Sequence, residues 1–171
     1  TEGKREVIQE MIKQKSRRYQ ETGIWDMLAV DEYKKFYQGL ADLQSNVISE
    51  VHCTALNVGD VTVATHVGFV AKDTFYYLMP TYEGGEWGKY SPGRLLLLEL
   101  IKWSINNGLK YFDFTVGGEA YKKNWCNIEA ELYETINPVG IRGWAYVSTL
   151  ETKRVLRKIS IFRKLVRAIR N

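Results

Sequence analysis

The chain of 171 residues, 45% hydrophobic and 26% charged, has the size and balance of one compact globular domain with an ordinary core. This composition excludes a disordered tail, a collagen-like fibre and a disulfide-rich miniprotein. Two cysteines, Cys53 and Cys126, are too few for a disulfide framework or a zinc site, so we expect a reducing compartment, buried thiols and no metal. Apolar runs such as Leu95–Leu98 are far shorter than the roughly 20 residues that span a bilayer, which predicts a soluble, cytoplasmic protein.

Positive charge is concentrated at the C-terminal end. Residues 149–171 hold eight of the 24 Lys and Arg residues and one of the 20 acidic residues, a net charge of +7, whereas the remainder holds 16 and 19, a net charge of −3. Helical spacing of apolar residues predicts a basic amphipathic helix over Thr149–Ile169, after a single domain over residues 1–148. Such a helix fits an anionic membrane surface, a tRNA or anionic glycan, or docking on the sheet. We favour docking or peripheral contact with the inner face of the membrane through residues 153–170, and expect no specific nucleic-acid binding.

Two helices are predicted at the start of the chain. The first spans Lys4–Glu21 and ends at Gly23. Its apolar stripe is Val7, Ile8, Met11, Ile12, Lys15 and Tyr19. The second helix begins with Asp31 as its N-cap. Its stripe is Tyr33, Phe36, Tyr37, Leu40 and Leu43.

Alternation with a period of two then predicts an antiparallel meander of three strands. The strands span Val47–Val58, Val61–Phe69 and Thr74–Met79. Gly59–Asp60 supplies the first hairpin turn and residues 71–73 supply the second.

A loop, a helix and a strand follow the meander. After the loop at Pro80–Tyr90, Ser91 is the predicted N-cap and Pro92 the first turn of a helix that ends at Asn107. Residues 110–115 form a predicted short buried strand. A strand, a helix and a strand in this order imply a parallel pair with a right-handed crossover.

The remaining elements complete a mixed α/β fold with a central sheet flanked by helices. We predict a short helix at Glu119–Trp125, a long strand at Glu129–Ile136, a break at Pro138–Gly140 and an extended piece at Gly143–Val147.

The segment Ser91–Leu95 has the chemistry of an anion site. The first turn of a helix presents unpaired N–H groups and the positive end of the dipole, Gly93 permits close approach, and Arg94 adds a charged fork. We expect Ser91, Pro92, Gly93, Arg94 and Leu95 to bind a group such as a pyrophosphate. The alternative is that the segment only begins a helix.

The stretch Tyr90–Trp125 reads YSPGRLLLLELIKWSINNGLKYFDFTVGGEAYKKNW. It contains an SPG-R-L helix start, an F-D-F strand and a G-x-x-x-Y-K-x-x-W element in that order, and it resembles the signature of the cellulose-biosynthesis-associated acetyltransferase family. This family is a branch of the GNAT superfamily, related to the Fem-type aminoacyl transferases. The order of elements is consistent with the resemblance from about Lys4 to Val147.

The resemblance implies a GNAT fold that binds acetyl-CoA or another acyl-CoA between the third and fourth strands, with its pyrophosphate on Ser91–Leu95. It implies acyl transfer to an amine or hydroxyl of a small molecule or glycan, in polysaccharide or envelope biosynthesis. The Gly-x-Gly/Ala pattern favoured by the superfamily is absent after Gly93. The donor therefore stays open between acyl-CoA and the aminoacyl-tRNA of the Fem relatives, whose tRNA the basic tail would hold. A domain that binds without catalysis is the third alternative, and the oligomeric state is left open.

Acyl transfer needs a base for the acceptor proton, an acid for the leaving thiolate and a donor to the oxyanion. Asp113, within the aromatic strand Tyr111–Phe114, either acts as a base or holds the acceptor, or it caps residues 117–119 or pairs with Lys122. Tyr121 and Lys122 occupy the positions where the resemblance implies a Tyr-Lys pair. Tyr121 is the candidate acid, and Lys122 either stabilises negative charge or is a solvated lysine.

His66 is a further candidate base. It shares a strand face with Thr62, Ala64 and Gly68, whose small side chains would leave space around the imidazole. The alternative is a structural histidine. His52 is expected to face solvent or a partner.

Three residues are candidate substrate contacts. Trp87 and Tyr82 lie in a polar, Gly-rich loop, where aromatic faces stack on sugars or on adenine. Glu119 is a candidate contact for the acceptor.

Overall fold

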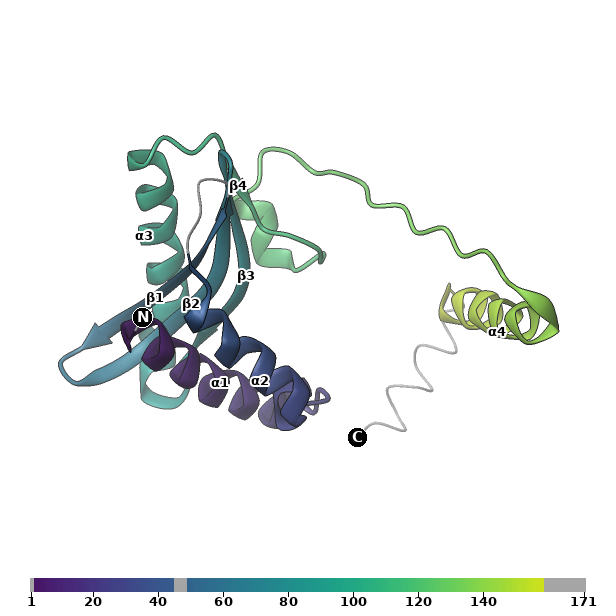
Figure 1. The fold of residues 1–171 in the computed structure, drawn as a ribbon, viewed down its shortest axis with the longest axis horizontal. Coiled ribbons are helices and arrows are strands. Elements are labelled where there is room, and N and C mark those ends of the chain that lie inside the picture. The colour runs from purple at the N-terminus through teal and green to yellow at the C-terminus, as the bar shows by residue number, and fades with distance from the viewer. Residues whose placement is uncertain (1, 45–48, 159–171) are drawn as a thin grey trace. The chain divides into compact units, whose positions relative to one another are not determined.

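The computed structural model describes residues 2–44 and 49–158 (Figure 1). The chain divides into two compact units, Thr1–Asn124 and Trp125–Asn171. The predicted domain limit at residue 148 falls within a helix of the second unit.

The first unit begins with two helices, α1 (Glu2–Thr22) and α2 (Asp31–Gly39), joined through a short 3-10 turn at Met27–Ala29. The predicted first helix is confirmed. The prediction of Asp31 as an N-cap is wrong, because Val30 is the extended capping residue and Asp31 is already helical. The Asp31 carboxylate lies in the first turn, where its negative charge interacts favourably with the positive end of the helix dipole.

A four-stranded mixed sheet follows, in the order β1-β2-β3-β4. Strands β1 (Ser49–Val58), β2 (Val61–Ala71) and β3 (Thr74–Tyr82) form the predicted antiparallel meander, with Gly59 at a φ of 58° in the first turn. Residues 47 and 48 of the predicted first strand lie outside the described residues. The third strand continues three residues beyond its predicted end at Met79.

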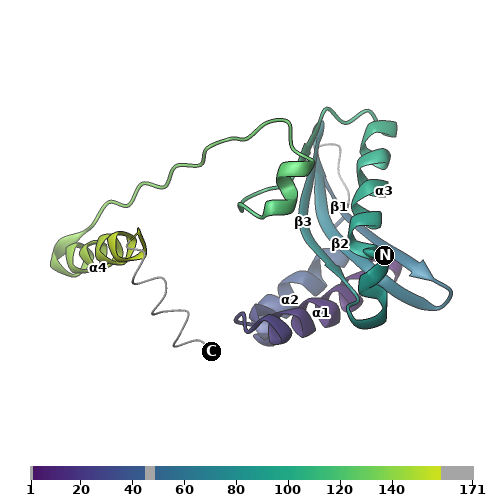
Figure 2. The ribbon, with the colours of Figure 1, turned by 180° about the vertical axis from the view of Figure 1, so that it is seen from behind.

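The crossover to the fourth strand runs through α3 (Pro92–Asn106) (Figure 2). β4 (Tyr111–Asp113) pairs with β3 in parallel, as predicted. The prediction of a buried strand over residues 110–115 needs correction, since β4 has three residues and its Tyr111 is 58% exposed. Within residues 2–44 and 49–158, β4 is an edge strand, which pairs with β3 on one side.

Helices cover both faces of the sheet in the first unit. Gln14 of α1 contacts Thr65, whereas the next residue on β2, His66, belongs to the aromatic group beneath α3. Because neighbouring strand residues point to opposite faces, α1 and α3 lie on opposite sides. The α1 side contains the apolar core, formed by Ile8, Met11, Ile12, Leu28, Leu40, Ala41, Val51 and Val67.

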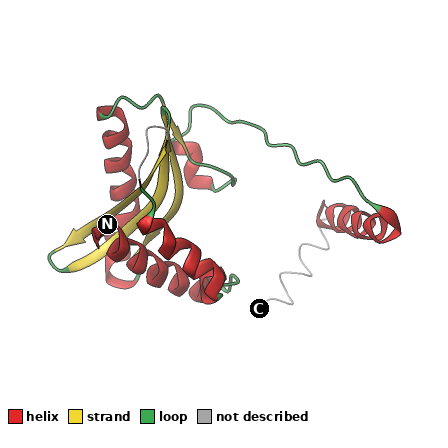
Figure 3. Ribbon diagram, viewed as in Figure 1, coloured by secondary structure: helices red, strands yellow, loops and turns green. Residues whose placement is uncertain are grey.

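The second unit contains α4 (Gly140–Lys158), which Figure 3 colours as a helix. The predicted strand at 129–136 is wrong, because these residues are extended but join no ladder among the described residues. The extended piece predicted at 143–147 is also wrong, since it lies inside α4. Residues 149–158 of the predicted basic helix are helical, as part of α4, which begins nine residues earlier at Gly140. Residues 159–169 of the predicted helix lie outside the described residues.

No helix within residues 2–44 and 49–158 combines the length and the apolar character needed to cross a membrane.

Candidate active site

The parallel pairing between β3 and β4 ends at Asp113. Their pairing joins Thr74–Tyr76 to Tyr111–Asp113, after which β4 ends and β3 continues to Tyr82. A β-bulge follows at once in β3, because two residues, 77 and 78, stand opposite the single residue Gly68. The last residues of β3 therefore present one edge that β4 does not cover.

The first turn of α3 follows this open edge. Ser91 adopts a left-handed conformation, with φ 51° and ψ 53°, and its side chain caps no amide, so the predicted side-chain cap is wrong. Instead, the Ser91 carbonyl accepts hydrogen bonds from the amides of Arg94 and Leu95, at 2.9 and 3.2 Å. The buried Pro92 has no N–H. This leaves the Gly93 N–H as the amide of the turn without a carbonyl acceptor among the described residues.

Tyr82 packs directly against this turn. A Cβ atom on Gly93 would stand 2.9 Å from Cδ1 of the Tyr82 ring, so the ring needs a glycine at this position. The guanidinium carbon of Arg18 lies 5.9 Å from the centre of the same ring. Tyr82 is thus part of the wall behind Gly93, and its outer part stays exposed. Trp87, half-buried, lies 6.2 Å from the ring of Tyr90.

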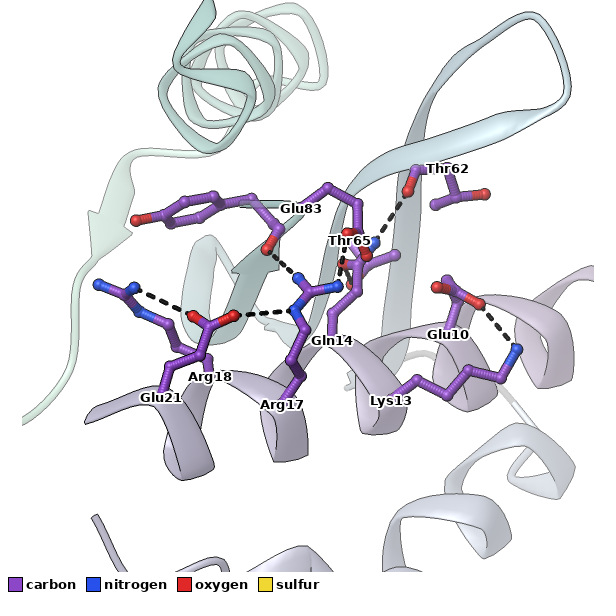
Figure 4. Close-up of polar contacts among 10 residues, drawn as sticks. Glu10, Lys13, Gln14, Arg17, Arg18, Glu21, Thr62, Thr65 and Glu83 are labelled. Atoms are coloured by element: carbon purple, nitrogen blue, oxygen red, sulfur yellow. Dashed lines mark hydrogen bonds and ion pairs between the residues drawn. The ribbon is translucent and has the colours of Figure 1, made fainter. Parts of the chain in front are cut away.

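Helix α1 holds the end of β3 through charged side chains (Figure 4). Arg17 donates from Nη2 to the Tyr82 carbonyl at 3.1 Å and forms an ion pair with Glu83. Its Nε also lies 3.4 Å from Glu21, which pairs with Arg18. The segment that leads into α3 is therefore fixed to α1.

Lys122 organises the loop that follows β4. The residue is 9% exposed, and its Nζ lies 3.4, 3.3 and 3.3 Å from the carbonyl oxygens of Thr115, Val116 and Gly117. Nζ also lies 2.8 Å from Oε2 of Glu119, and this hydrogen bond lowers the pKa of that carboxyl. A solvated lysine is excluded. Lys122 pairs with Glu119 in place of the expected Asp113.

Asp113 caps the same loop from the other end. Its exposed carboxylate accepts a hydrogen bond of 2.6 Å from the amide of Thr115. The rings of Phe112 and Phe114 lie on the inner side of β4. Asp113 points to the opposite side, where Tyr76 is its partner in the register with β3. The predicted cap at residues 117–119 is thus replaced by one at Thr115.

Tyr121 lies at the outer end of a series of rings. Its ring is 41% exposed and stands 6.3 Å from Phe114, which is 5.5 Å from Tyr77. Burial, and then the neighbouring Tyr121, raise the pKa of Tyr77. A phenol in this position is accessible to a substrate while its ring rests on the core.

His66 lies in the core, and the space expected around its ring is filled. The residue is 0% exposed and is stacked between Phe75 and Tyr77, with ring centres 5.3 and 4.7 Å away. Gly68 makes room for it, because a Cβ there would stand 2.6 Å from His66 Cε1. Burial, and then His52, lower the pKa of His66 to about 3. Among the described residues neither ring nitrogen has a hydrogen-bond partner. The role of His66 as a base stays a prediction, and a substrate would not reach this enclosed ring in the conformation described.

The expectation that His52 faces solvent or a partner is also wrong. Its ring packs against Trp103 of α3 at 4.5 Å and Phe75 at 5.0 Å. Burial lowers its pKa.

Lys15 of α1 is a residue of this site that the sequence analysis did not single out. Its Nζ donates to the carbonyl of Pro80 at 3.1 Å and lies 5.7 Å from the centre of the Tyr19 ring. Burial lowers the pKa of the ammonium, and the charge of Glu119 acts in the opposite direction. The sequence contains one indication of its role, because this lysine occupies a position in the otherwise apolar stripe of the first helix.

The predicted residues thus form two groups, with His66 apart from both. Tyr82 joins Gly93 and the rest of the α3 turn, whereas Asp113, Glu119, Tyr121 and Lys122 surround the loop after β4. Lys15 interacts with both groups, because it donates to the Pro80 carbonyl of β3 and the charge of Glu119 raises its pKa against the effect of burial. The first group suits an anion, and the second supplies a phenol, two carboxylates and an ammonium for proton transfer and charge stabilisation.

The two thiols and the acidic residues are the side chains that could ligate a metal ion. Both cysteines are half-buried rather than buried, and burial raises the pKa of Cys53 to about 11, which favours the thiol over the thiolate. Within residues 2–44 and 49–158, no three side chains of His, Cys, Asp or Glu gather as a metal site would require.

The family described as the acetyltransferase (GNAT) domain matches residues 1–123. The chain belongs to this family, and its mixed sheet flanked by helices is consistent with a GNAT acyltransferase fold, as predicted. Domains of this family transfer acyl groups and use acyl-CoA as co-substrate. No curated protein and no solved structure matches the chain.

Proposed function

We propose that the protein transfers an acetyl or other acyl group from acyl-CoA to an amine or hydroxyl of a small molecule or a sugar-linked acceptor. One observation carries this proposal: β3 runs past the end of β4 and leads into a helix whose first turn carries Gly93 and Arg94. The donor would lie along this edge, with its reactive end toward the loop after β4.

The turn of α3 supports binding of the donor's pyrophosphate. The Gly93 N–H and the positive end of the helix dipole attract an anion, and Arg94, on the exposed part of the turn, adds a guanidinium. Only one amide of the turn is available, so we assign Arg94 a large share of the binding energy.

The loop after β4 supports the chemical step. The acceptor nitrogen or oxygen attacks the thioester carbonyl and the C–S bond breaks. The acceptor proton passes to the exposed carboxylate of Asp113, and the CoA thiolate gains a proton from an acid. We assign Tyr121 as the acid that protonates the thiolate, because its ring is exposed beside Phe114. Asp113 and Glu119, both exposed, are the candidates for holding the acceptor, and Lys122 orders the loop that carries them.

The biological setting that we propose is polysaccharide or envelope biosynthesis in the cytoplasm, close to the inner face of the membrane. Its support is the resemblance of Tyr90–Trp125 to the cellulose-associated acetyltransferases and the net charge of +7 on residues 149–171.

Calorimetric titration with acetyl-CoA and with CoA tests the donor. We expect micromolar binding by the wild type, and weakening of about tenfold in Arg94→Ala, the range of a lost charged hydrogen bond. Lys102→Ala is the matched control, since Lys102 lies on the same helix and pairs with Glu99.

Absence of CoA binding at low salt would contradict the proposal. If the wild type instead bound tRNA in a salt-dependent manner, the Fem-like aminoacyl transfer would replace it. Binding of CoA without thiol release in the presence of acceptors would favour a domain that only binds.

A further inference from the structure

The open edge of β3 has a defined hydrogen-bonding direction. The Glu83 amide donates to the Val63 carbonyl at 2.9 Å, and the pairs Thr65 with Thr81 and Val67 with Met79 continue this register. In an antiparallel ladder, backbone groups point toward and away from a given neighbour at alternate residues. The backbone groups of Pro80 and Tyr82 consequently point away from β2. They point to the edge of β3 along which β4 pairs only with Thr74–Tyr76.

This edge lacks a donor at Pro80. Proline has no N–H, so a ligand that extends along β3 finds a carbonyl there but no amide. A carbonyl of the ligand at this level would stay unpaired, which is unfavourable when it is removed from water.

Helix α1 supplies side chains to the same edge. Lys15 Nζ donates to the Pro80 carbonyl at 3.1 Å, and Arg17 Nη2 donates to the Tyr82 carbonyl at 3.1 Å. The two side chains differ in their other partners. Arg17 is held by Glu83 and Glu21, whereas Lys15 carries three N–H groups, of which the Pro80 carbonyl takes one.

We propose that Lys15 replaces the backbone donor that Pro80 lacks, and that its ammonium binds a carbonyl oxygen of the extended pantetheine arm of the donor. The inference rests on the proposed function. It assigns to α1 a donor-binding role in addition to its role in the core.

The surroundings of Lys15 agree with this assignment. Its ammonium is partly withdrawn from water beside Tyr19, and Glu119 is close enough to influence it. Partial burial strengthens a charged hydrogen bond to a ligand carbonyl, and the Pro80 carbonyl fixes the direction of the ammonium.

Two probes separate the arm from the nucleotide: CoA, and 3′-phosphoadenosine 5′-diphosphate, which keeps the pyrophosphate and lacks the pantetheine arm. In calorimetric titrations of the full chain, we expect Lys15→Met to weaken CoA binding about tenfold and to leave binding of the nucleotide unchanged. Lys13→Met is the matched control on the same helix, because Lys13 pairs with Glu10 at the surface. Lys15→Gln serves as a second variant, and thermal unfolding verifies that each variant is folded.

Pro80→Ala in the Lys15→Met background gives a rescue test. It places a backbone N–H on the open edge, so we expect it to recover part of the lost CoA affinity.

The outcomes distinguish the inference from the proposed function. Unchanged CoA binding in Lys15→Met, equal weakening for both probes, or no recovery with Pro80→Ala would overturn the role of Lys15 while the function stands. Failure of the wild type to bind CoA would overturn both.

Discussion

Single residues in this structure take partners that the folded backbone decides. Lys122 binds the carbonyls of Thr115, Val116 and Gly117 and the carboxylate of Glu119, whereas Asp113 was one expected partner. Lys15 reaches a carbonyl 65 residues away. A sequence pattern indicates that such a residue is unusual, as a lysine in an apolar stripe is, but only the folded backbone selects its partner.

His66 shows the same dependence in the core. Its residue type suggested a base, and the small residues on its strand face suggested space. The rings that fill this space come from β3, whose side-chain placement cannot be obtained from spacing along β2.

The burial of His66 predicts a pH-dependent stability. Its pKa is lowered to about 3 in the folded state, against an ordinary value of about 6.5, so the unfolded state binds a proton that the folded state does not. The free energy of unfolding should therefore fall by about 1.4 kcal/mol between pH 7.5 and pH 5.5. Urea unfolding at these two pH values measures the change.

The variant His66→Leu removes the titrating group. We expect it to lose most of the pH dependence, with a smaller part left from His52, whose pKa is also lowered. Equal pH dependence in the variant and the wild type would show that His66 is not buried in its neutral form.

At the scale of elements, local periodicity was sufficient for α1 and for the meander β1–β3, whose turns are short and contain Gly59 or residues 71–73. It was not sufficient for residues 129–136. Alternation makes this segment suitable for a strand, but a strand exists only where another edge accepts it. The helix start at Gly140 was missed because the residues of its first turns also allow an extended conformation.

The contact between β3 and the first turn of α3 gives a prediction at this scale. Gly93→Ala places a methyl group 2.9 Å from the Tyr82 ring, so the ring or the turn must move. We expect a loss of about 1–2 kcal/mol in the free energy of unfolding, together with weaker CoA binding. Denaturant unfolding and calorimetry measure the two effects.

Gly88→Ala is the control for this substitution, because a Cβ on Gly88 meets nothing within 4 Å. Tyr82→Ala added to Gly93→Ala should relieve the clash and restore affinity in part. Equal stability of the two single glycine variants would mean that Tyr82 does not restrain the turn.

At the scale of the whole molecule, the candidate site is contained in one unit. The family match ends at residue 123 and the first unit ends at Asn124. Every residue assigned to donor or acceptor, from Lys15 on α1 to Lys122 after β4, lies within it. The sequence resemblance predicted the GNAT domain, which the family match confirms, whereas anion binding by the first turn of α3 stays a prediction. The number of amides available at that turn depends on the backbone conformation of Ser91.

The central claim is that the first turn of α3 binds the phosphates of the acyl carrier. Amide NMR of the uniformly labelled chain tests it directly, with the Gly93 resonance assigned by its loss in Gly93→Ala. On titration with CoA, we predict that the Gly93 amide shifts and saturates at the affinity measured by calorimetry, and that Arg94→Ala weakens this response. Saturating CoA that leaves the Gly93 amide unshifted would contradict the claim.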